Sequence, residues 1–259
     1  MSLAVLFYGT TKRAFRMFVR YGFDAVMQIV SLLILFALLF YGAKAVIGGG
    51  AAQHPQTLPA IVSGYFVWLL AVIGYSAVAQ SLLEEATQGT LEQLAMSPLG
   101  LRKVVVVDFA AGWITQLGLL VTMFVLSMLI SGQWLHVDVI SLFPLVILMT
   151  IGVFGVGLIA GGLAIVFKRI QAFLQLLQFG FVLLVAAPLD RLPWLKYFPL
   201  AYGNVLIRDV MVGRKSIFDM HAGDLLFLTV HSVAWMVIGL AVFGYLERVA
   251  RERALLGHY

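Results

Sequence analysis

The chain has 259 residues, of which 62% are hydrophobic and only 11% are charged, and its mean hydropathy is +1.02. A soluble domain usually has about 25% charged residues, so this chain has too little polar surface to coat a water-soluble globule. These proportions exclude a soluble enzyme and predict a protein whose solvent is the lipid bilayer. The formal net charge of +5 is modest, and the absence of cysteine excludes disulfides, thiolate metal sites and cysteine nucleophiles.

Six apolar runs have lengths near the roughly 20 residues that a helix needs to cross a membrane. The runs are continuous rather than alternating, which favours helices over a β-barrel. We therefore predict an all-α membrane protein with six transmembrane helices, forming one domain over residues 1–259 without a soluble domain. The fifth run is the shortest and precedes a proline-rich stretch. The predicted spans are Phe23–Ile47, Pro59–Leu83, Val104–Ser131, Val139–Phe167, Ala172–Ala187 and Leu225–Leu246.

Residues 1–22 place basic and apolar side chains on opposite sides of a helical projection. This sidedness is typical of a helix that lies in the membrane interface with its basic groups toward the headgroups. An ordinary basic flank of the first span accounts for the charge but not for the sidedness. A long apolar core and a small-residue cleavage site are missing, so we do not expect a signal peptide. The basic residues of this predicted interfacial helix are Lys12, Arg13, Arg16 and Arg20.

The distribution of lysine and arginine predicts the orientation, because these residues accumulate on the cytoplasmic side of membrane proteins. With both termini inside, eleven of the seventeen basic residues lie on the cytoplasmic side and six lie on the other. Five of those six lie within residues 188–224. We therefore expect a multi-pass protein of the cytoplasmic (inner) membrane of a prokaryote, with both termini cytoplasmic.

Residues 188–224, between the fifth and sixth spans, are too long and too aromatic for a plain loop. Trp194, Tyr197 and Tyr202 suit the membrane interface, which accommodates both an apolar ring and a polar tip. Asn204–Met211 is compatible with a short amphipathic helix. We predict one or two short outer re-entrant helices in this segment, before the last span.

The segment between the second and third spans combines helix capping with an apolar stripe. Thr90 and Gln93 have the spacing of a capping box, and Pro98 ends the predicted helix. Leu91 and Leu94 share one face of this helix and would be exposed in the cytosol unless a partner covered them. A simple cytoplasmic turn, the alternative interpretation, needs neither this stripe nor the three nearby glutamates. These glutamates are Glu84, Glu85 and Glu92.

Two motifs resemble those of ABC-2 type permeases, the membrane subunits of a class of ATP-binding-cassette exporters. The first is Glu-x-x-x-x-Gly-Thr-Leu-Glu-x-Leu-x-x-Ser-Pro-Leu over residues 84–99, after the second of six spans. The second is Leu-Pro-Trp-Leu over residues 192–195, followed by Pro-Leu-x-Tyr over residues 199–202 and then Arg208. The family usually has asparagine before the later proline, where this chain has Phe198. The resemblance covers essentially the whole chain.

The resemblance implies that residues 84–103 form the coupling helix region, which docks on a separate ATPase subunit, and that residues 1–22 form the connecting helix. ATP and Mg²⁺ are then expected on that partner, since this chain has no Gly-x-x-x-x-Gly-Lys-Ser/Thr loop. We expect no catalytic residue, metal or cofactor on this chain. Its expected partners are the ATPase, a second permease copy (identical or a close homologue) and membrane lipids, but no nucleic acid. The implied docking residues are Glu84, Glu85, Gly89, Thr90, Leu91, Glu92, Leu94 and Pro98.

Glutamines inside the apolar spans are candidates for a translocation path. Gln171, Gln175 and Gln178 share one face of the fifth predicted helix, and Gln80 and Gln116 lie in the second and third. An unpaired amide is unfavourable in hydrocarbon, so these side chains must face protein or a hydrated path. Hydrogen bonds that hold the helices together are an equal alternative.

The fourth predicted span is rich in glycine, and close helix packing is the default explanation. A helix contact that rearranges during transport is the alternative. The glycines are Gly152, Gly155, Gly157, Gly161 and Gly162.

Aromatic and ionisable residues in the spans have alternative interpretations too. The aromatic residues of the second span line a route for an amphiphilic cargo, or they face lipid or the membrane interface. We expect His231 to be a hydrogen-bonded interior histidine rather than a proton relay, and Asp24 and Asp108 to anchor span ends. The aromatics are Tyr65, Phe66, Trp68 and Tyr75.

The predicted function is export of a lipid-like or hydrophobic compound, such as a drug, lipid or glycoconjugate, by ATP-driven alternating access. An ion-coupled transporter or channel is an alternative, but such proteins usually carry ionisable residues near mid-membrane. A membrane-embedded enzyme is a further alternative and would require converging histidines for metal-assisted hydrolysis. Here the histidines are scattered along the chain, and only His231 lies in a predicted span.

Overall fold

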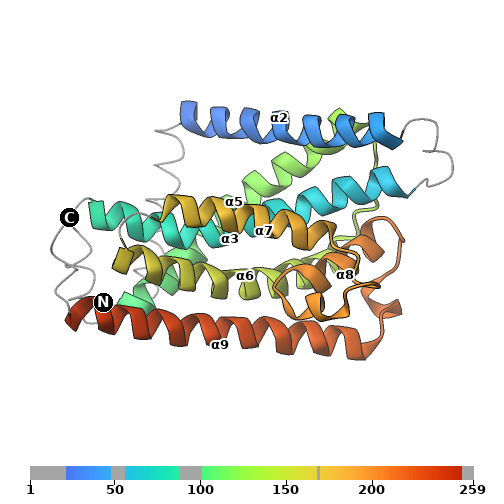
Figure 1. The fold of residues 1–259 in the computed structure, drawn as a ribbon. Coiled ribbons are helices and arrows are strands. Elements are labelled where there is room, and N and C mark those ends of the chain that lie inside the picture. Colours follow the sequence, from blue (N-terminus) through green and yellow to red (C-terminus); the bar gives the residue numbers. More distant parts are fainter. Residues whose placement is uncertain (1–21, 48–55, 88–100, 168–169, 253–259) are drawn as a thin grey trace.

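The computed structural model describes residues 22–47, 56–87, 101–167 and 170–252, and these residues form helices and connecting turns without strands (Figure 1). In chain order the elements are α2 (Gly22–Ile47), α3 (Thr57–Thr87), α5 (Leu101–Ser131), α6 (Val139–Phe167), α7 (Gln171–Ala186), η2 (Pro193–Tyr197), α8 (Ala201–Met211), η3 (Ile217–Asp219) and α9 (Ala222–Glu252).

Five of the described helices, α2, α3, α5, α6 and α9, are long and apolar enough to cross a membrane. Their positions match five predicted spans, although α9 extends beyond the predicted Leu225–Leu246 at both ends. Helix α7 has only 16 residues. At 1.5 Å per residue it is about 24 Å long, which is less than the roughly 30 Å of a hydrocarbon core. The chain is therefore a multi-pass membrane protein, and the count of six spans stays a prediction.

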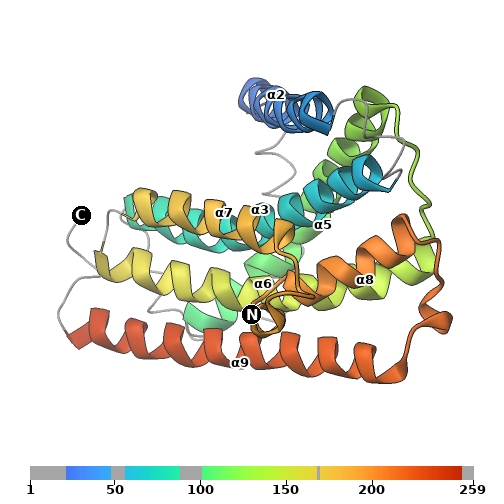
Figure 2. The same cartoon turned by 45° about the vertical axis from the view of Figure 1, so that its right-hand side comes forward.

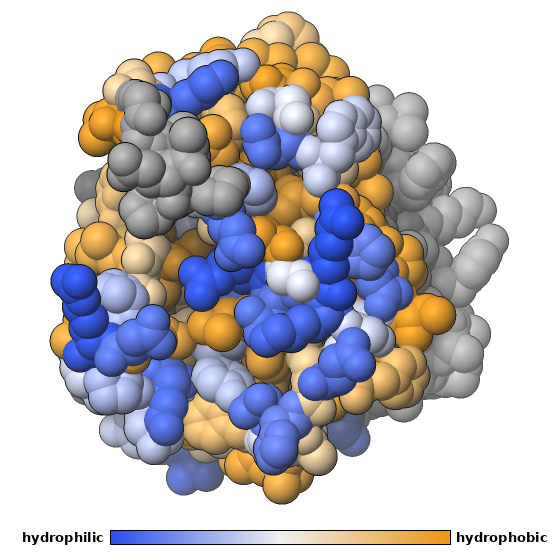
Figure 3. All heavy atoms as spheres, turned by 90° about the vertical axis from the view of Figure 1, so that its right-hand side faces the viewer, coloured by the Kyte–Doolittle hydropathy of each residue, from blue (hydrophilic) through white to orange (hydrophobic). Residues whose placement is uncertain are grey.

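The long helices alternate in direction, so the bundle has two distinct ends (Figure 1). One end, which we call the inner end, contains the start of α2, the end of α9 and the two helix ends that flank residues 88–100. The opposite, outer end contains the end of α2, the start of α9 and residues 187–221. Figure 3 shows this outer end, where hydrophilic side chains gather over the middle of the face and apolar ones lie around them.

Helix α6 is central because it packs against α9 on one side and α3 on another. A Cβ atom added to Gly155 would overlap the carbonyl oxygen of Trp235 in α9. A Cβ added to Gly157 would lie 3.1 Å from the Cα of Tyr75, and one added to Gly161 would lie 2.7 Å from the Leu82 side chain, both in α3. The expectation that these glycines allow close helix packing is therefore confirmed.

Helices α2 and α5 stand farther from this centre. Figure 2 shows α2 at the edge of the bundle and α5 running obliquely to the other long helices. Phe36 and Phe40 of α2 are buried, whereas Leu38 and Leu39 between them are exposed. Helix α2 therefore contacts the rest of the chain along a narrow face and leaves most of its apolar surface for lipid or another protein.

The outer segment inserts between the long helices instead of lying flat on their ends. The main-chain carbonyl of Tyr197 in η2 is 2.9 Å from His231 Nε2 and accepts a 3.2 Å hydrogen bond from the Trp235 indole. His231 lies nine residues inside α9, so η2 reaches well past the first turns of that helix. His231 is a hydrogen-bonded histidine, as the sequence predicted.

Helix α8 is the amphipathic helix of this segment and begins at Ala201, three residues before the predicted Asn204. Leu200 precedes it with φ of 76°, a left-handed conformation that is unfavourable for a side chain larger than glycine and turns the chain sharply. Gly203 then packs on the Met149 side chain of α6. The Tyr202 hydroxyl donates a 2.6 Å hydrogen bond to Asp224 at the start of α9. Helix α8 is thus fixed to both α6 and α9.

Candidate functional site

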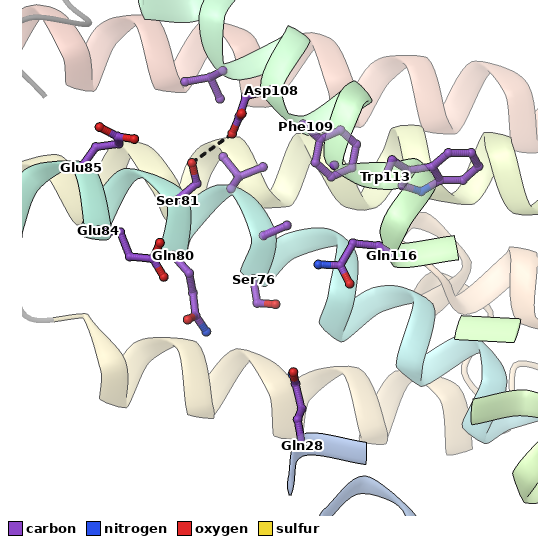
Figure 4. A pocket seen from close by; sticks show the side chains of 14 residues that line it. Gln28, Ser76, Gln80, Ser81, Glu84, Glu85, Asp108, Phe109, Trp113 and Gln116 are labelled. Atoms are coloured by element: carbon purple, nitrogen blue, oxygen red, sulfur yellow. Dashed lines mark hydrogen bonds between the residues drawn. The ribbon is translucent and has the colours of Figure 1, made fainter. Parts of the chain in front are cut away.

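A cavity of about 390 Å³ lies near the inner end, between α2, α3 and α5 (Figure 4). We call it the inner cavity. Ser76, Gln80 and Glu84 follow one another at four-residue intervals along one side of α3, while Gln28 enters from α2 and Gln116 from α5. Amide, hydroxyl and carboxylate groups on three apolar helices thus make a polar chamber inside a region that is otherwise hydrophobic.

The wall between α3 and α5 is held by hydrogen bonding. The Ser81 hydroxyl donates a 3.2 Å hydrogen bond to Asp108 Oδ2, as Figure 4 shows. Glu84, Glu85 and Asp108 also have interaction partners within the chain. Asp108 therefore links two helices near their inner ends, in keeping with the expectation that it anchors a span. The side chain of Asp24 lies outside the described residues.

A second cavity, of about 380 Å³, lies near the outer end between α2, α3, α7 and α8. We call it the outer cavity. Its wall is mostly apolar and includes Phe36, Tyr65 and Trp68. Asn204 and Arg208, both from α8, also line it. The outer cavity therefore combines an apolar chamber with one permanently charged group.

An aromatic cluster of three residues forms part of the wall of the outer cavity. The rings of Phe36 and Tyr65 are 4.7 Å apart, and those of Tyr65 and Trp68 are 5.6 Å apart. The Tyr65 hydroxyl donates a 2.8 Å hydrogen bond to the Leu32 carbonyl, which ties α3 to the middle of α2. Since Gln28 and Phe36 line different cavities from nearby turns of α2, the inner and outer cavities follow one another along α2 and α3.

The four aromatics of the second span are buried within the bundle, so the lipid-facing interpretation of these residues is wrong. Tyr65 and Trp68 line the outer cavity and are only 5% and 4% exposed. Phe66 packs on Phe124 of α5 with ring centroids 4.8 Å apart. The Tyr75 hydroxyl donates a 3.0 Å hydrogen bond to the Leu174 carbonyl of α7.

The structure brings together two of the five candidate path glutamines. Gln80 and Gln116 both line the inner cavity. Gln171, Gln175 and Gln178 line neither cavity; the first two are exposed on α7 and the third is half-buried. Within the described part of the chain, none of the five side chains forms a hydrogen bond that joins two helices. These contacts therefore do not support the interpretation that the glutamines hold the helices of one chain together by hydrogen bonds.

Sequence reasoning assigned no role in a cavity to Gln28, Asn204 or Arg208, although each of them lines one. Gln28 is an isolated amide within the first apolar run, which is the same signal that identified Gln80 and Gln116. Arg208 belonged to the second motif but carried no assigned role, and Asn204 marked only a predicted helix start. Nothing in the spacing along the chain indicated that α8 faces α2 and α3 across a cavity.

Two residues of the predicted ATPase-docking set belong to the described part of the chain. Glu84 is exposed and Glu85 half-buried near the end of α3. The others, Gly89, Thr90, Leu91, Glu92, Leu94 and Pro98, lie outside the described residues, as do Lys12, Arg13, Arg16 and Arg20 of the predicted connecting helix. The coupling and connecting helices therefore stay predictions.

Two cavities in line along the same helices of a multi-pass α-helical membrane protein are the features of a transport subunit. Comparison with family models gives the particular class: residues 51–241 match the family described as ABC-2 family transporter protein. This match covers well over half of the chain, and the chain belongs to that family. The resemblance to ABC-2 type permeases is thereby confirmed. No curated protein matches the chain.

Proposed function

We propose that the chain is the membrane-spanning subunit of an ATP-driven exporter of a lipid-like or hydrophobic compound. The observation that carries the proposal is the pair of cavities along α2 and α3, polar near the inner end and mostly apolar near the outer end. An amphiphile has both polar and apolar parts, so a path that begins with a polar cavity and continues with a mostly apolar one suits it better than it suits a purely polar compound.

Alternating access needs a barrier that opens and closes, and the aromatic cluster of Phe36, Tyr65 and Trp68 is placed to act as one. A small displacement of α2 relative to α3 would separate Phe36 from Tyr65 and join the two cavities. Helix α2 packs along a narrow face, so such a movement breaks few contacts. Rigid-body rotation of whole helices or subunits is a common form of this switch.

The energy source is proposed to be ATP bound with Mg²⁺ on a separate ATPase subunit, which docks below the predicted coupling helix. The apolar face of Leu91 and Leu94 would supply most of the docking free energy through the hydrophobic effect. Exposed ion pairs made by Glu84, Glu85 or Glu92 would contribute only about 0–1 kcal/mol each and would set the register of docking.

A second permease copy is proposed to face α7. Gln171 and Gln175 are exposed on this apolar helix, and burying an unpaired amide in lipid is unfavourable. A neighbouring copy, or a hydrated path between two copies, would provide polar surroundings for both side chains. The orientation that places the inner end in the cytoplasm of a prokaryote follows from the basic residues and belongs to the same proposal.

Replacing Leu91 and Leu94 with aspartate tests the proposal. We expect the double variant to insert into the membrane normally, to lose co-purification with its ATPase and to lose ATP-dependent transport, because charged side chains cannot enter an apolar docking cleft. Phe218→Asp is the matched control, since Phe218 is 84% exposed at the outer end, and it should retain both properties. Unchanged ATPase association in the double variant would contradict the docking assignment. Transport that persists without any ATPase would favour an ion-coupled transporter or channel.

A further inference from the structure

We propose that the outer cavity binds an anionic amphiphile, with its apolar chain inside the cavity and its phosphate or carboxylate group paired with Arg208. The inference rests on the proposed function where it names the class of cargo. The binding site itself stands on the geometry of the outer cavity and is testable without transport.

The chamber suits an apolar chain. Its volume of about 380 Å³ lies within the usual range for small-molecule sites, about 300–1,000 Å³. Side chains from four helices line it, most of them aliphatic or aromatic, and Gly64 and Ala60 leave room on the α3 side. The polar groups of Tyr65 and Trp68 are already hydrogen-bonded to main-chain carbonyls of Leu32 and Gln178. The aromatic wall therefore presents apolar ring surface to an occupant.

Arg208 supplies the charge complementarity. A guanidinium stays protonated in proteins and binds carboxylate or phosphate oxygens in pairs. The outer cavity has no acidic residue in its lining, and within the described part of the chain Arg208 forms no ion pair. The neighbouring carboxylate of Asp209 is bound by Lys215 at 2.7 Å. Residues 48–55, which follow α2, contain no aspartate or glutamate.

A purely structural role for this arginine is a weaker explanation. Cations in the last turn of a helix stabilise its carbonyl end, and Arg208 lies in the last turn of α8. The carbonyl of Arg208 already accepts main-chain hydrogen bonds from Val212 and Gly213, at 2.8 and 3.2 Å. The C-terminal end of α8 is thus capped by main-chain hydrogen bonds, and the Arg208 guanidinium is available to bind an anion.

Asn204 narrows the class of ligand. Its Nδ2 donates a 2.9 Å hydrogen bond to the Val185 carbonyl at the end of α7. Its Oδ1 is buried and accepts no hydrogen bond from any described residue, an unfavourable state for a polar atom. Because this oxygen is closed to solvent, a hydroxyl or amide N–H next to the acidic group of the ligand would satisfy it only when the amide turns toward the cavity. A phosphate ester of glycerol has both features.

A third cavity in the bundle is as apolar as the outer cavity but lacks an equivalent of Arg208. About 500 Å³ of space lies between α6, α7, η2 and α9, and its lining includes Phe173, Trp194 and Trp235 but no charged residue. That cavity offers an apolar chain the same environment without an anion partner. Of these two cavities, only the outer one is therefore expected to prefer a ligand with an anionic head.

The test measures thermal unfolding of the purified full chain in dodecyl maltoside micelles, since a ligand that binds the folded state raises Tm. The probes are lysophosphatidic acid, lysophosphatidylcholine of the same chain length, and inorganic phosphate. We expect Tm to rise with lysophosphatidic acid and to stay unchanged with the other two, because the site needs both an anion and a chain. An equal rise with lysophosphatidylcholine, or a rise with phosphate alone, would overturn the proposal.

Two variants locate the effect. Arg208→Gln should weaken the apparent affinity for lysophosphatidic acid by about tenfold or more, whereas Arg191→Gln, an exposed arginine of the same outer segment, should not. Ala60→Phe should also weaken binding by filling the cavity, while Ala234→Phe on the exposed face of α9 should not. Unaltered binding by both cavity variants would refute the site even if transport is ATP-driven. Binding in a chain that recruits no ATPase would refute the proposed function and leave the site standing.

Discussion

Gly155 and Gly239 mark the closest approach of two long helices. A Cβ at Gly155 would overlap the carbonyl of Trp235, and a Cβ at Gly239 would overlap the backbone of Gly155. Backbone atoms cannot rotate away, whereas the Met149 side chain that faces Gly203 can. In lipid, helices are held together chiefly by such van der Waals contact, because the surrounding tails are as apolar as the helices. The α6–α9 contact therefore depends on the missing side chains at these two positions.

Gly155→Ala should lower the free energy of unfolding by about 1–3 kcal/mol, the usual cost of overpacking. Gly118→Ala is the matched control, since a Cβ at Gly118 in α5 would have no neighbour within 4 Å. Alanine favours a helix over glycine by about 1 kcal/mol, so the control should be neutral or slightly more stable. Unfolding by sodium dodecyl sulfate in mixed micelles measures both variants. Equal effects would mean that the α6–α9 contact does not depend on the absence of a side chain at Gly155.

At the scale of elements, the sequence predicted the long helices well because their length and apolar composition decide them locally. The start of α8 was missed by three residues, since the turn depends on Leu200 in a left-handed conformation that no sequence rule indicates for leucine. The inner cavity was predicted only in part. Helical spacing told which residues of one helix share a face, as for Gln171, Gln175 and Gln178. It did not tell that Gln28 and Gln116 meet Gln80 from two other helices. Such adjacency is set by packing between elements far apart in the chain.

The connection between α8 and α9 is fastened to the start of α6 by Ser141. Its hydroxyl donates a hydrogen bond to Asp138 and accepts one of 2.8 Å from the Ile217 amide of η3. Asp138 in turn accepts a 3.2 Å hydrogen bond from the Ile140 amide and thereby caps α6. The Ser141 hydroxyl thus joins a helix start to a loop 76 residues later in the chain.

Ser141→Ala should loosen this connection. The Ile217 amide loses its acceptor, so amide hydrogen exchange over residues 212–221 should become faster, with a loss of stability of about 1 kcal/mol. Thr122→Val removes a hydroxyl that bonds only within its own helix, to the Gly118 carbonyl, and should leave that exchange unchanged. Similar exchange in Ser141→Ala and the native chain would show that the loop is held by other contacts.

The same variant has a pH signature. The hydrogen bond from Ser141 is the main cause that holds the pKa of Asp138 below its ordinary value. A carboxyl group with a lowered pKa in the folded state stabilises the fold above its unfolded pKa, and this contribution is lost as the pH falls through the folded pKa. Ser141→Ala should therefore lose less stability than the native chain between about pH 6 and pH 3. Measurements of Tm against pH in detergent test this difference.

At the scale of the whole molecule, the two sides of the bundle present different surfaces. The outward face of α9 exposes Leu226, Val230, Val233 and Val237, which lipid tails can cover without loss. Helix α7 exposes Gln171 and Gln175, which lipid cannot satisfy. The outer end is hydrophilic over its middle (Figure 3). Lipid tails alone can therefore solvate the α9 side of a single chain, whereas the exposed amides on the α7 side need a polar environment.

This asymmetry predicts where a second copy binds. Single cysteines at Gln171, Gln175 or Gln178 should yield a disulfide-linked dimer on mild oxidation in native membranes, most strongly at the position closest to a two-fold axis. Val233→Cys should stay monomeric, because lipid covers that face. The native chain has no cysteine, so each cross-link is assigned without ambiguity on a denaturing gel. Cross-linking at Val233 alone would place the second copy against α9, and it would leave the exposed amides of α7 to a partner other than this chain.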